Sequence, residues 1–186
     1  SNKYGPGGNK DKVSTDGGDT SLLFEAGDKL TNIPTQINDR IGATPVVGNA
    51  GFETGCVVGN PPAAPWTVGG ASNKDCNNSV FRTGGWSVRV NNAYVYQTLN
   101  LKSGFNYNFS AYARDNAASG PTLTLLISST AGGGVTYCQA ATTATVFTLV
   151  TCNYTPTSDQ TVYLNLMAAG GVSFNGYFDD VSVSIN

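Results

Sequence analysis

The chain closes on the stretch Gly176-Tyr177-Phe178-Asp179-Asp180-Val181-Ser182-Val183-Ser184-Ile185-Asn186, whose alternation decides the fold. Apolar residues hold one parity of a two-residue period and serines hold the other, which is the signature of a strand with one buried face. Asp179 lies on the apolar parity, so a regular strand would point its carboxylate inward, where it needs a cation or several hydrogen-bond donors. Asp180 lies on the opposite parity, and we expect it to face solvent.

Similar alternation recurs upstream and predicts about nine short strands. The clearest runs cover residues 86–90, 95–101, 105–112, 123–128, 135–139, 145–154 and 161–167. The turns between them are rich in Gly, Ser, Thr, Asn and Pro, and no amphipathic helix separates them. This pattern predicts an all-β fold, a sandwich or barrel of antiparallel sheets. Because Lys102-Ser103-Gly104 joins two of the runs, we expect those two strands to form a hairpin.

The length of 186 residues suits one domain with an amino-terminal extension. Residues 1–20 hold almost no apolar side chains and are expected to form a tail or linker. Residues 21–41 carry apolar anchors at irregular spacing. We therefore divide the chain into an extension, residues 1–42, and a β-sandwich, residues 43–186. The anchors would either pack along the sandwich or dock, as residues 20–42, onto a neighbouring molecule as an added strand.

Charge and composition exclude several classes of function. Charged residues make up 12% of the chain and the formal net charge is −2, so nucleic acid, which binds basic surfaces, is not an expected partner. The sequence has no histidine, which rules out Ser-His-Asp and Cys-His catalytic groups and the common zinc sites. The only glutamates are Glu25 and Glu53, and we expect no independent enzymatic activity. No apolar run reaches membrane length.

The cysteines are even in number and are expected to form disulfides. Sequence proximity favours Cys56 with Cys76 and Cys138 with Cys152, although three pairings are open. A hairpin around residues 140–144 would place Cys138 opposite Cys152 at bridging distance. Disulfides indicate an oxidising compartment, so we expect a secreted, extracellular protein. Three N-x-S/T sequons agree with secretion and mark candidate glycosylation sites at Asn77, Asn108 and Asn153.

The order of several landmarks is more specific than any one motif. In chain order they are Asn49-Ala50-Gly51-Phe52-Glu53-Thr54-Gly55, Pro65-Trp66-Thr67, Gly84-Gly85-Trp86-Ser87-Val88-Arg89-Val90, Val95-Tyr96-Gln97-Thr98-Leu99, Gly104–Arg114 and Phe178-Asp179-Asp180-Val181-Ser182-Val183. From about Thr44 to Asn186 the chain resembles the family 4 and family 9 type of carbohydrate-binding module, in its secreted fungal versions. The resemblance implies a galactose-binding-like jelly roll, a β-sandwich of two antiparallel sheets, that binds a polysaccharide or glycan without catalysing a reaction.

The resemblance also implies a structural calcium where the first and last strands meet, with Glu53 and Asp179 as carboxylate ligands. Calcium is a hard cation that accepts many oxygen ligands, which suits such a site. The alternative is that Glu53 caps a turn and Asp179 accepts backbone hydrogen bonds without a metal. Trp66 and Trp86 occupy core positions in the resemblance, and Gln97 shares the inward parity, so we expect all three to be structural.

The outward tyrosines are the candidates for binding sugar. Aromatic rings can cover the apolar faces of sugars while polar groups satisfy the hydroxyls. The candidate ligand-binding residues, on the outer face of the predicted hairpin, are Tyr94, Tyr96, Tyr112, Arg114, Asn106 and Ser110. The alternative is an ordinary strand surface. A glycan on Asn108 would occupy the same face and compete with binding.

A second hypothesis for function is a structural surface protein. Its amino-terminal extension would link subunits by donating a strand to a neighbour, and the scattered apolar anchors of residues 20–42 motivate it. Glycan binding and self-association therefore both stand as expectations.

Overall fold

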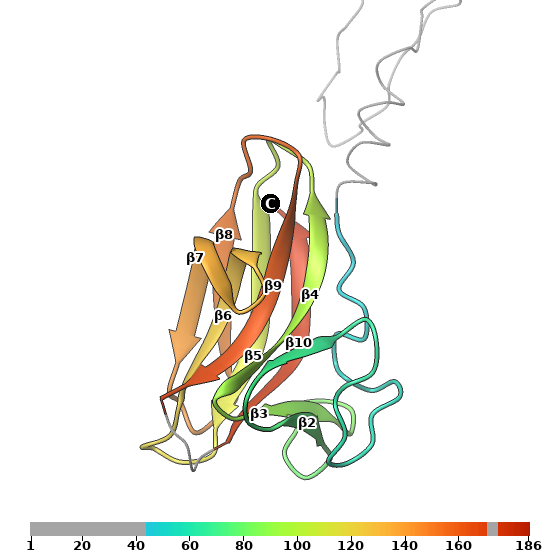
Figure 1. The fold of residues 1–186 in the computed structure, drawn as a ribbon, viewed down its shortest axis with the longest axis vertical. Helices are drawn as coiled ribbons and strands as arrows, with labels where there is room; N and C mark the ends of the chain where they lie inside the picture. The colour runs from blue at the N-terminus through green and yellow to red at the C-terminus, as the bar shows by residue number, and fades with distance from the viewer. Residues whose placement is uncertain (1–43, 171–174) are drawn as a thin grey trace, which may run out of the picture. The chain divides into compact units, whose positions relative to one another are not determined.

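The computed structural model of the chain describes residues 44–170 and 175–186, which form a sandwich of ten strands in two antiparallel sheets (Figure 1). Sheet I has the strand order β1-β4-β9-β6-β7, with the bounds Thr67–Gly70, Ala93–Leu101, Gln160–Ala169, Thr122–Thr130 and Gly133–Thr142. Sheet II has the order β2-β3-β10-β5-β8, with the bounds Lys74–Asn77, Ser87–Val90, Gly176–Ile185, Tyr107–Asp115 and Thr148–Tyr154. The predicted all-β sandwich is confirmed. No helix in this described part of the chain could cross a membrane.

The core lies between the two sheets and is made by the inward residues of the long strands. Val95, Phe109 and Leu164, from three different strands, are fully buried. Trp66 is also buried and stacks on Phe52 with the ring centroids 5.0 Å apart, as expected of a core tryptophan. Trp86, the other predicted core tryptophan, packs against the core but is only partly buried.

Gln97 points inward and ties the segment before β1 to β4. Its side-chain amide donates to the carbonyl oxygen of Gly48 at 2.7 Å and accepts from the backbone N–H of Gly48 at 3.1 Å. A buried amide needs such partners, because leaving either polar end unpaired costs free energy. The structural role predicted for Gln97 is confirmed.

The predicted hairpin around Lys102-Ser103-Gly104 is wrong. β4, which ends at Leu101, pairs with β1 and β9 in sheet I, whereas β5, which begins at Tyr107, pairs with β10 and β8 in sheet II. The connection between them therefore crosses from one sheet to the other. As a result, the outer faces of β4 and β5 point to opposite sides of the sandwich.

The closing strand, β10, contains an irregularity that changes its phase. Its register against β5 shifts between Asp179 and Ser182, and Asp180 adopts a φ of 47°. Such a bulge inserts one extra residue, so the residues before it and after it alternate out of step. The prediction that Asp179 faces the sandwich interior is therefore wrong: Phe178 belongs to the core, and Asp179 lies on the outer side of sheet II.

The two predicted disulfides are present, Cys56–Cys76 and Cys138–Cys152, with Cα atoms 5.6 Å and 5.8 Å apart. The second disulfide does not close a hairpin as expected. Cys138 lies on β7 in sheet I and Cys152 on β8 in sheet II, so this bond joins the edge strands of the two sheets. The rings of Tyr137 and Tyr154 stack 4.8 Å apart at the same pair of edges.

The predicted extension, residues 1–42, lies outside the residues that the structure describes. The division of the chain at residue 43 and the docking of residues 20–42 therefore stay predictions.

Candidate functional site

Three tyrosines form a row on the outer face of sheet I. Tyr94 and Tyr96 come from β4 and Tyr163 from β9, and all three are partly exposed. The ring centroids of Tyr94 and Tyr96 are 6.1 Å apart, and those of Tyr96 and Tyr163 are 5.7 Å apart, with interplanar angles of 39° and 51°. We call these three residues the tyrosine strip.

Strand alternation and register explain how the strip forms. Val95 and Leu99 point into the core, so Tyr94 and Tyr96 must point outward. In the antiparallel pair of β4 and β9, Tyr163 lies opposite Thr98 and is therefore a diagonal neighbour of Tyr96. Diagonal neighbours on one face of a sheet are within reach of aromatic side chains.

The Tyr94 ring is held between two glycines. A Cβ added at Gly69 on β1, or at Gly132 in the turn between β6 and β7, would collide with this ring. Gly132 also has a φ of 71°, a conformation that residues with a Cβ rarely adopt. Glycine at both positions lets the backbone close in on Tyr94 from two sides.

Asn165 anchors the turn beside the strip. It is fully buried although it lies on the outer face of sheet I, opposite Tyr96. Its Oδ1 accepts from the backbone N–H of Gly132 at 2.7 Å, and its Nδ2 donates to Leu126 O, Ser128 Oγ and Tyr163 O. This amide therefore fixes the turn between β6 and β7 against the sheet, where the turn forms one side of the site.

Neutral polar side chains share the outer face of sheet I with the strip. Thr98 and Asn100 on β4 and Gln139 on β7 are exposed on the same face of sheet I. Thr161 on β9 donates its hydroxyl to Asn100 Oδ1 at 2.7 Å. Hydroxyl and amide groups can both donate and accept hydrogen bonds. The site thus combines flat rings with groups that match hydroxyl-rich ligands.

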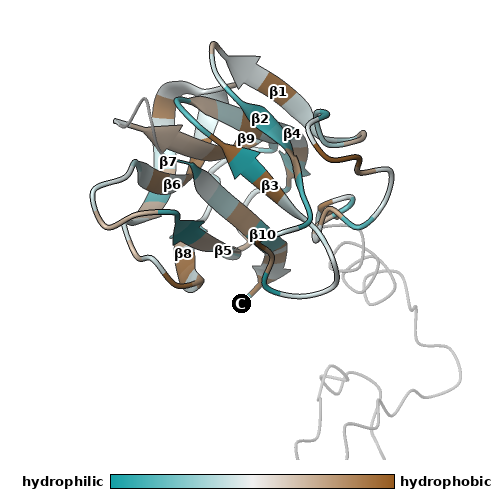
Figure 2. Ribbon diagram, turned by 90° about the horizontal axis from the view of Figure 1, so that it is seen from below, coloured by the Kyte–Doolittle hydropathy of each residue, from teal (hydrophilic) through white to brown (hydrophobic). Residues whose placement is uncertain are grey.

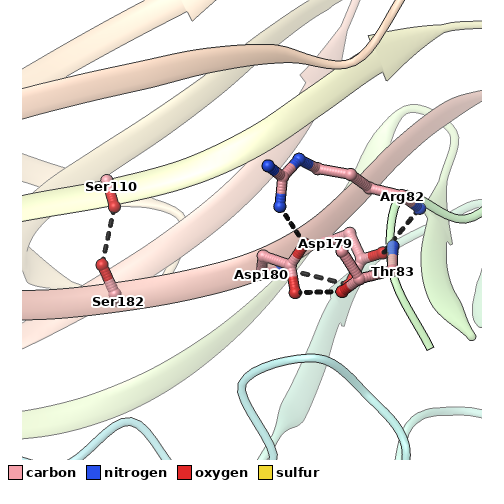
Figure 3. Close-up of polar contacts among 6 residues, drawn as sticks. All are labelled: Arg82, Thr83, Ser110, Asp179, Asp180 and Ser182. Carbon is pink, nitrogen blue, oxygen red and sulfur yellow. Dashed lines mark hydrogen bonds and ion pairs between the residues drawn. The ribbon is translucent and has the colours of Figure 1, made fainter.

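The structure does not bring the remaining predicted binding residues to this site. Ser110, Tyr112 and Arg114 lie on β5 in sheet II, and Asn106 just precedes that strand. Ser110 shares a hydrogen bond with Ser182 at 2.7 Å (Figure 3), and Arg114 Nε donates to Thr145 O at 3.0 Å. The predicted set was assembled on the assumption of a hairpin, and the crossing between sheets divides it.

Tyr112 is already in contact with a cation. The guanidinium of Arg82 lies over its ring at 3.5 Å from the centroid, a cation–π contact. Arg82 also pairs with Asp180 Oδ2 at 2.7 Å, so Asp180, which was expected to face solvent, is partly exposed and engaged in an ion pair. A ligand that stacked on this face of the Tyr112 ring would therefore have to displace Arg82.

Glu53 and Asp179 hold one loop, residues 82–86, from both ends. Asp179 is fully buried beneath this loop, and its Oδ2 accepts the backbone N–H groups of Arg82 at 2.8 Å and Thr83 at 3.2 Å (Figure 3). Its Oδ1 accepts the N–H of Asp180 at 2.8 Å. Glu53 accepts the N–H groups of Gly85 and Trp86 at 3.1 Å. We call this arrangement the carboxylate clamp.

The carboxylate clamp fits hydrogen-bonded carboxylates better than a metal site. Both oxygens of Asp179 and both oxygens of Glu53 already accept N–H groups of the chain. Among the described residues, no three Asp, Glu, His or Cys side chains are grouped so that they could hold a metal ion. A cation would have to share these oxygens with the N–H donors. The backbone hydrogen bonds that the alternative expects of Glu53 and Asp179 are present, and calcium ligation by the two residues stays a prediction.

Burial changes the acidity of Asp179. Loss of water around the carboxylate raises its pKa from 3.8 to about 6, against the opposing effect of the N–H groups of Arg82, Thr83 and Asp180. The neighbouring charge of Asp180 adds a smaller rise. The clamp thus holds a carboxylate that is less stable in its ionised form than it would be in water.

No family model matches the chain, and no curated protein matches it. Solved structures do match. A structure described as TmCBM61 in complex with β-1,4-galactotriose has a TM-score of 0.56 and 17% identity, over 76% of this chain and 99% of that chain. One described as "CBM4 structure and function" has a TM-score of 0.56 and 19% identity, over 76% and 100%. The CBM22-1 xylan-binding domain from Paenibacillus barcinonensis Xyn10C has a TM-score of 0.54 and 16% identity, over 73% and 91%.

The chain therefore has the jelly-roll fold of carbohydrate-binding modules, as its landmarks predicted. A family 4 module, the type that the landmarks resemble, is among the matching structures. A structure described as CBM36 in complex with calcium and xylotriose is more distant, with a TM-score of 0.45. At these identities the likeness establishes the fold, and the ligand has to be argued from the site.

The raised pKa of Asp179 predicts a pH dependence of stability. Because the folded state favours the protonated carboxylate, stability should fall as pH rises from about 4 to about 6. The pKa difference between 3.8 and about 6 corresponds to about 3 kcal/mol. Asp179→Asn cannot ionise, so the free energy of unfolding of this variant relative to wild type should rise by that amount between about pH 3 and about pH 7. Urea denaturation of both proteins measures it, and a difference that does not vary with pH contradicts it.

The hydrogen bonding of the clamp predicts that a chelator does not destabilise the protein. In excess EDTA the melting temperature should equal that in calcium, because N–H groups of residues 82–86 already hold both carboxylates in place without a cation. Differential scanning calorimetry in the two buffers is the measurement. A melting temperature that falls in EDTA and recovers on addition of calcium would instead support calcium ligation by Glu53 and Asp179.

Proposed function

We propose that this chain is a non-catalytic module that binds glycans on the outer face of sheet I. The observation that carries the proposal is the tyrosine strip, three partly exposed rings from two paired strands, in which the centroid of the Tyr96 ring is 6.1 Å from that of Tyr94 and 5.7 Å from that of Tyr163. Solved modules with this fold, including one in complex with β-1,4-galactotriose, support it. The strip would supply the ring surface on which sugars stack.

The chemistry of the strip suits sugars. The apolar face of a pyranose covers an aromatic ring, and its hydroxyls at the rim need donors and acceptors. Exposed hydroxyls and amides at Thr98, Asn100 and Gln139 stand on the same face for that purpose. Because the rings are tilted relative to one another by 39° and 51°, they would contact a single glycan chain at successive angles.

Tyr112 on the opposite face is a weaker candidate. Its ring is stacked by Arg82, and that guanidinium is paired with Asp180, so a sugar would have to displace a contact that already exists. Ser110 and Arg114, its neighbours on β5, are likewise hydrogen-bonded within sheet II. The sugar-binding role is therefore assigned to Tyr94, Tyr96 and Tyr163.

The outer face of sheet I also lacks the carboxylates that glycoside hydrolysis would need. Glycoside hydrolysis requires two carboxylates flanking the bond to be cleaved. No Asp or Glu lies within the strands of sheet I, and the carboxylates of Glu53 and Asp179 are used by the clamp. The module would bind its glycan without cleaving it.

The proposed function implies an extracellular location. Both disulfides are compatible with an oxidising compartment. The three sequon asparagines, Asn77, Asn108 and Asn153, lie on strands of sheet II, and the side chain of Asn108 donates to Asn153 Oδ1 at 3.0 Å. Glycosylation at these positions would therefore not obstruct the tyrosine strip, and the competition expected at Asn108 does not arise.

Two tyrosine variants test the site, with a third as a matched control. Tyr96→Ala and Tyr163→Ala should each weaken binding about tenfold, which corresponds to about 1.4 kcal/mol of lost stacking. Tyr112→Ala removes a partly exposed tyrosine from the other sheet and should leave affinity within about twofold. Affinity electrophoresis in gels containing soluble polysaccharides measures all three.

Melting temperatures check that each variant is folded. If Tyr112→Ala weakens binding while Tyr96→Ala and Tyr163→Ala do not, the binding face is sheet II and the proposal is wrong.

A further inference from the structure

Charge is distributed unequally between the two sheets. The five strands of sheet I contain no Asp, Glu, Lys or Arg. The strands of sheet II carry Lys74, Asp75, Arg89, Arg114, Asp115, Asp179 and Asp180. Figure 2 shows the corresponding hydrophilic colour on β2 and β3, whereas β1 is pale to brown. The strands that carry and flank the tyrosine strip are thus built entirely from neutral residues.

Two of the charges closest in sequence to the strands of the strip neutralise each other. Lys102 follows β4 and Asp159 precedes β9, and their side chains pair at 2.7 Å at one end of sheet I. The Asp159 carboxylate also accepts the N–H of Ser103 at 2.9 Å. Beyond β1, the ammonium of Lys74 donates to the carbonyl oxygen of Gly70. Lys102 and Asp159 thus form an ion pair at one end of the sheet, and Lys74 is held at the β1 edge by a backbone carbonyl.

A neutral face selects its ligand by the cost of desolvation. A carboxylate or sulfate that leaves water needs a cation or several strong donors in exchange. The outer face of sheet I offers tyrosine rings, hydroxyls and amides, which match sugar hydroxyls but offset little of that cost. An amino sugar carrying a positive charge would likewise meet no carboxylate there.

We propose that the tyrosine strip takes uncharged glycan chains and discriminates against glycans that carry uronic acid, sulfate or ammonium groups. This inference rests on the proposed function, since it names the ligand class of the same site. Binding that involves no ion pair should also be insensitive to salt, because screening weakens only charged interactions.

Matched pairs of polysaccharides that share a backbone and differ in charge provide the test. The pairs are hydroxyethyl cellulose with carboxymethyl cellulose, methyl-esterified with de-esterified homogalacturonan, and unsubstituted xylan with glucuronoxylan. Affinity of the full chain for each is measured at about 0.05 M and about 0.5 M sodium chloride. The expected result is binding to at least one neutral member, the same at both salt concentrations, and several-fold weaker binding to its charged partner.

A positive charge placed beside the strip should shift the preference toward the carboxylated polysaccharide. Thr98→Lys adds an ammonium beside Tyr96 and opposite Tyr163, and should raise affinity for the carboxylated member several-fold in low salt only. Ser184→Lys, an exposed position on β10 in sheet II, adds the same charge away from the strip and should leave the preference unchanged.

The outcomes separate this inference from the proposed function. Binding that prefers the charged members, and that Tyr96→Ala abolishes, would overturn the neutral-ligand inference while the binding face stands. Equal binding of both members of a pair would overturn it as well. No binding to any polysaccharide of the panel at either salt concentration would overturn both the inference and the proposed function.

Discussion

Both sheets bury their inner faces against each other, and this shared apolar interior is the constraint on which the rest of the structure depends. Residues such as Val95, Phe109 and Leu164 are fully buried in this interior. Since each long strand must give one face to the interior, only its alternate residues are free to meet solvent. On β4 those residues include Tyr94 and Tyr96, and pairing with β9 adds Tyr163. The tyrosines of the proposed binding face therefore point outward because their neighbours in the strands point into the core.

The same constraint explains what could be predicted from the sequence. The alternation in residues 95–101 was enough to place Tyr94 and Tyr96 outward and Gln97 inward. The number and order of the cysteines were enough to favour Cys56–Cys76 and Cys138–Cys152. The strand inferences succeed because alternation is a local property of the chain. The Cys138–Cys152 pairing is present although the hairpin expected to close it is not, since the bond joins the two sheets.

The sheet to which each strand belongs could not be predicted from these local patterns. A short connection such as residues 102–106 can close a hairpin or cross between sheets, and only the pairing partners of β4 and β5 decide between the two. For this reason the sequence grouped Tyr112 with Tyr96 and missed Tyr163. The bulge at Asp180 was not recognised either: aspartate tolerates a positive φ better than most residues, but nothing in the Asp179-Asp180 pair marks which strand position carries an extra residue. One inserted residue was enough to turn Asp179 from the interior to the outer side of sheet II.

The most direct test of the binding face is an amide chemical-shift titration of the labelled protein with an oligosaccharide of a polysaccharide that it binds. If the tyrosine strip is the site, the largest shifts fall on β4 and β9, around Tyr94, Tyr96 and Tyr163, and on the turn at Gly132 that touches Tyr94. Residues of β5 and β8 should not shift. Shifts concentrated around Tyr112 and Ser110, with β4 and β9 unaffected, would contradict the assignment of the site to sheet I.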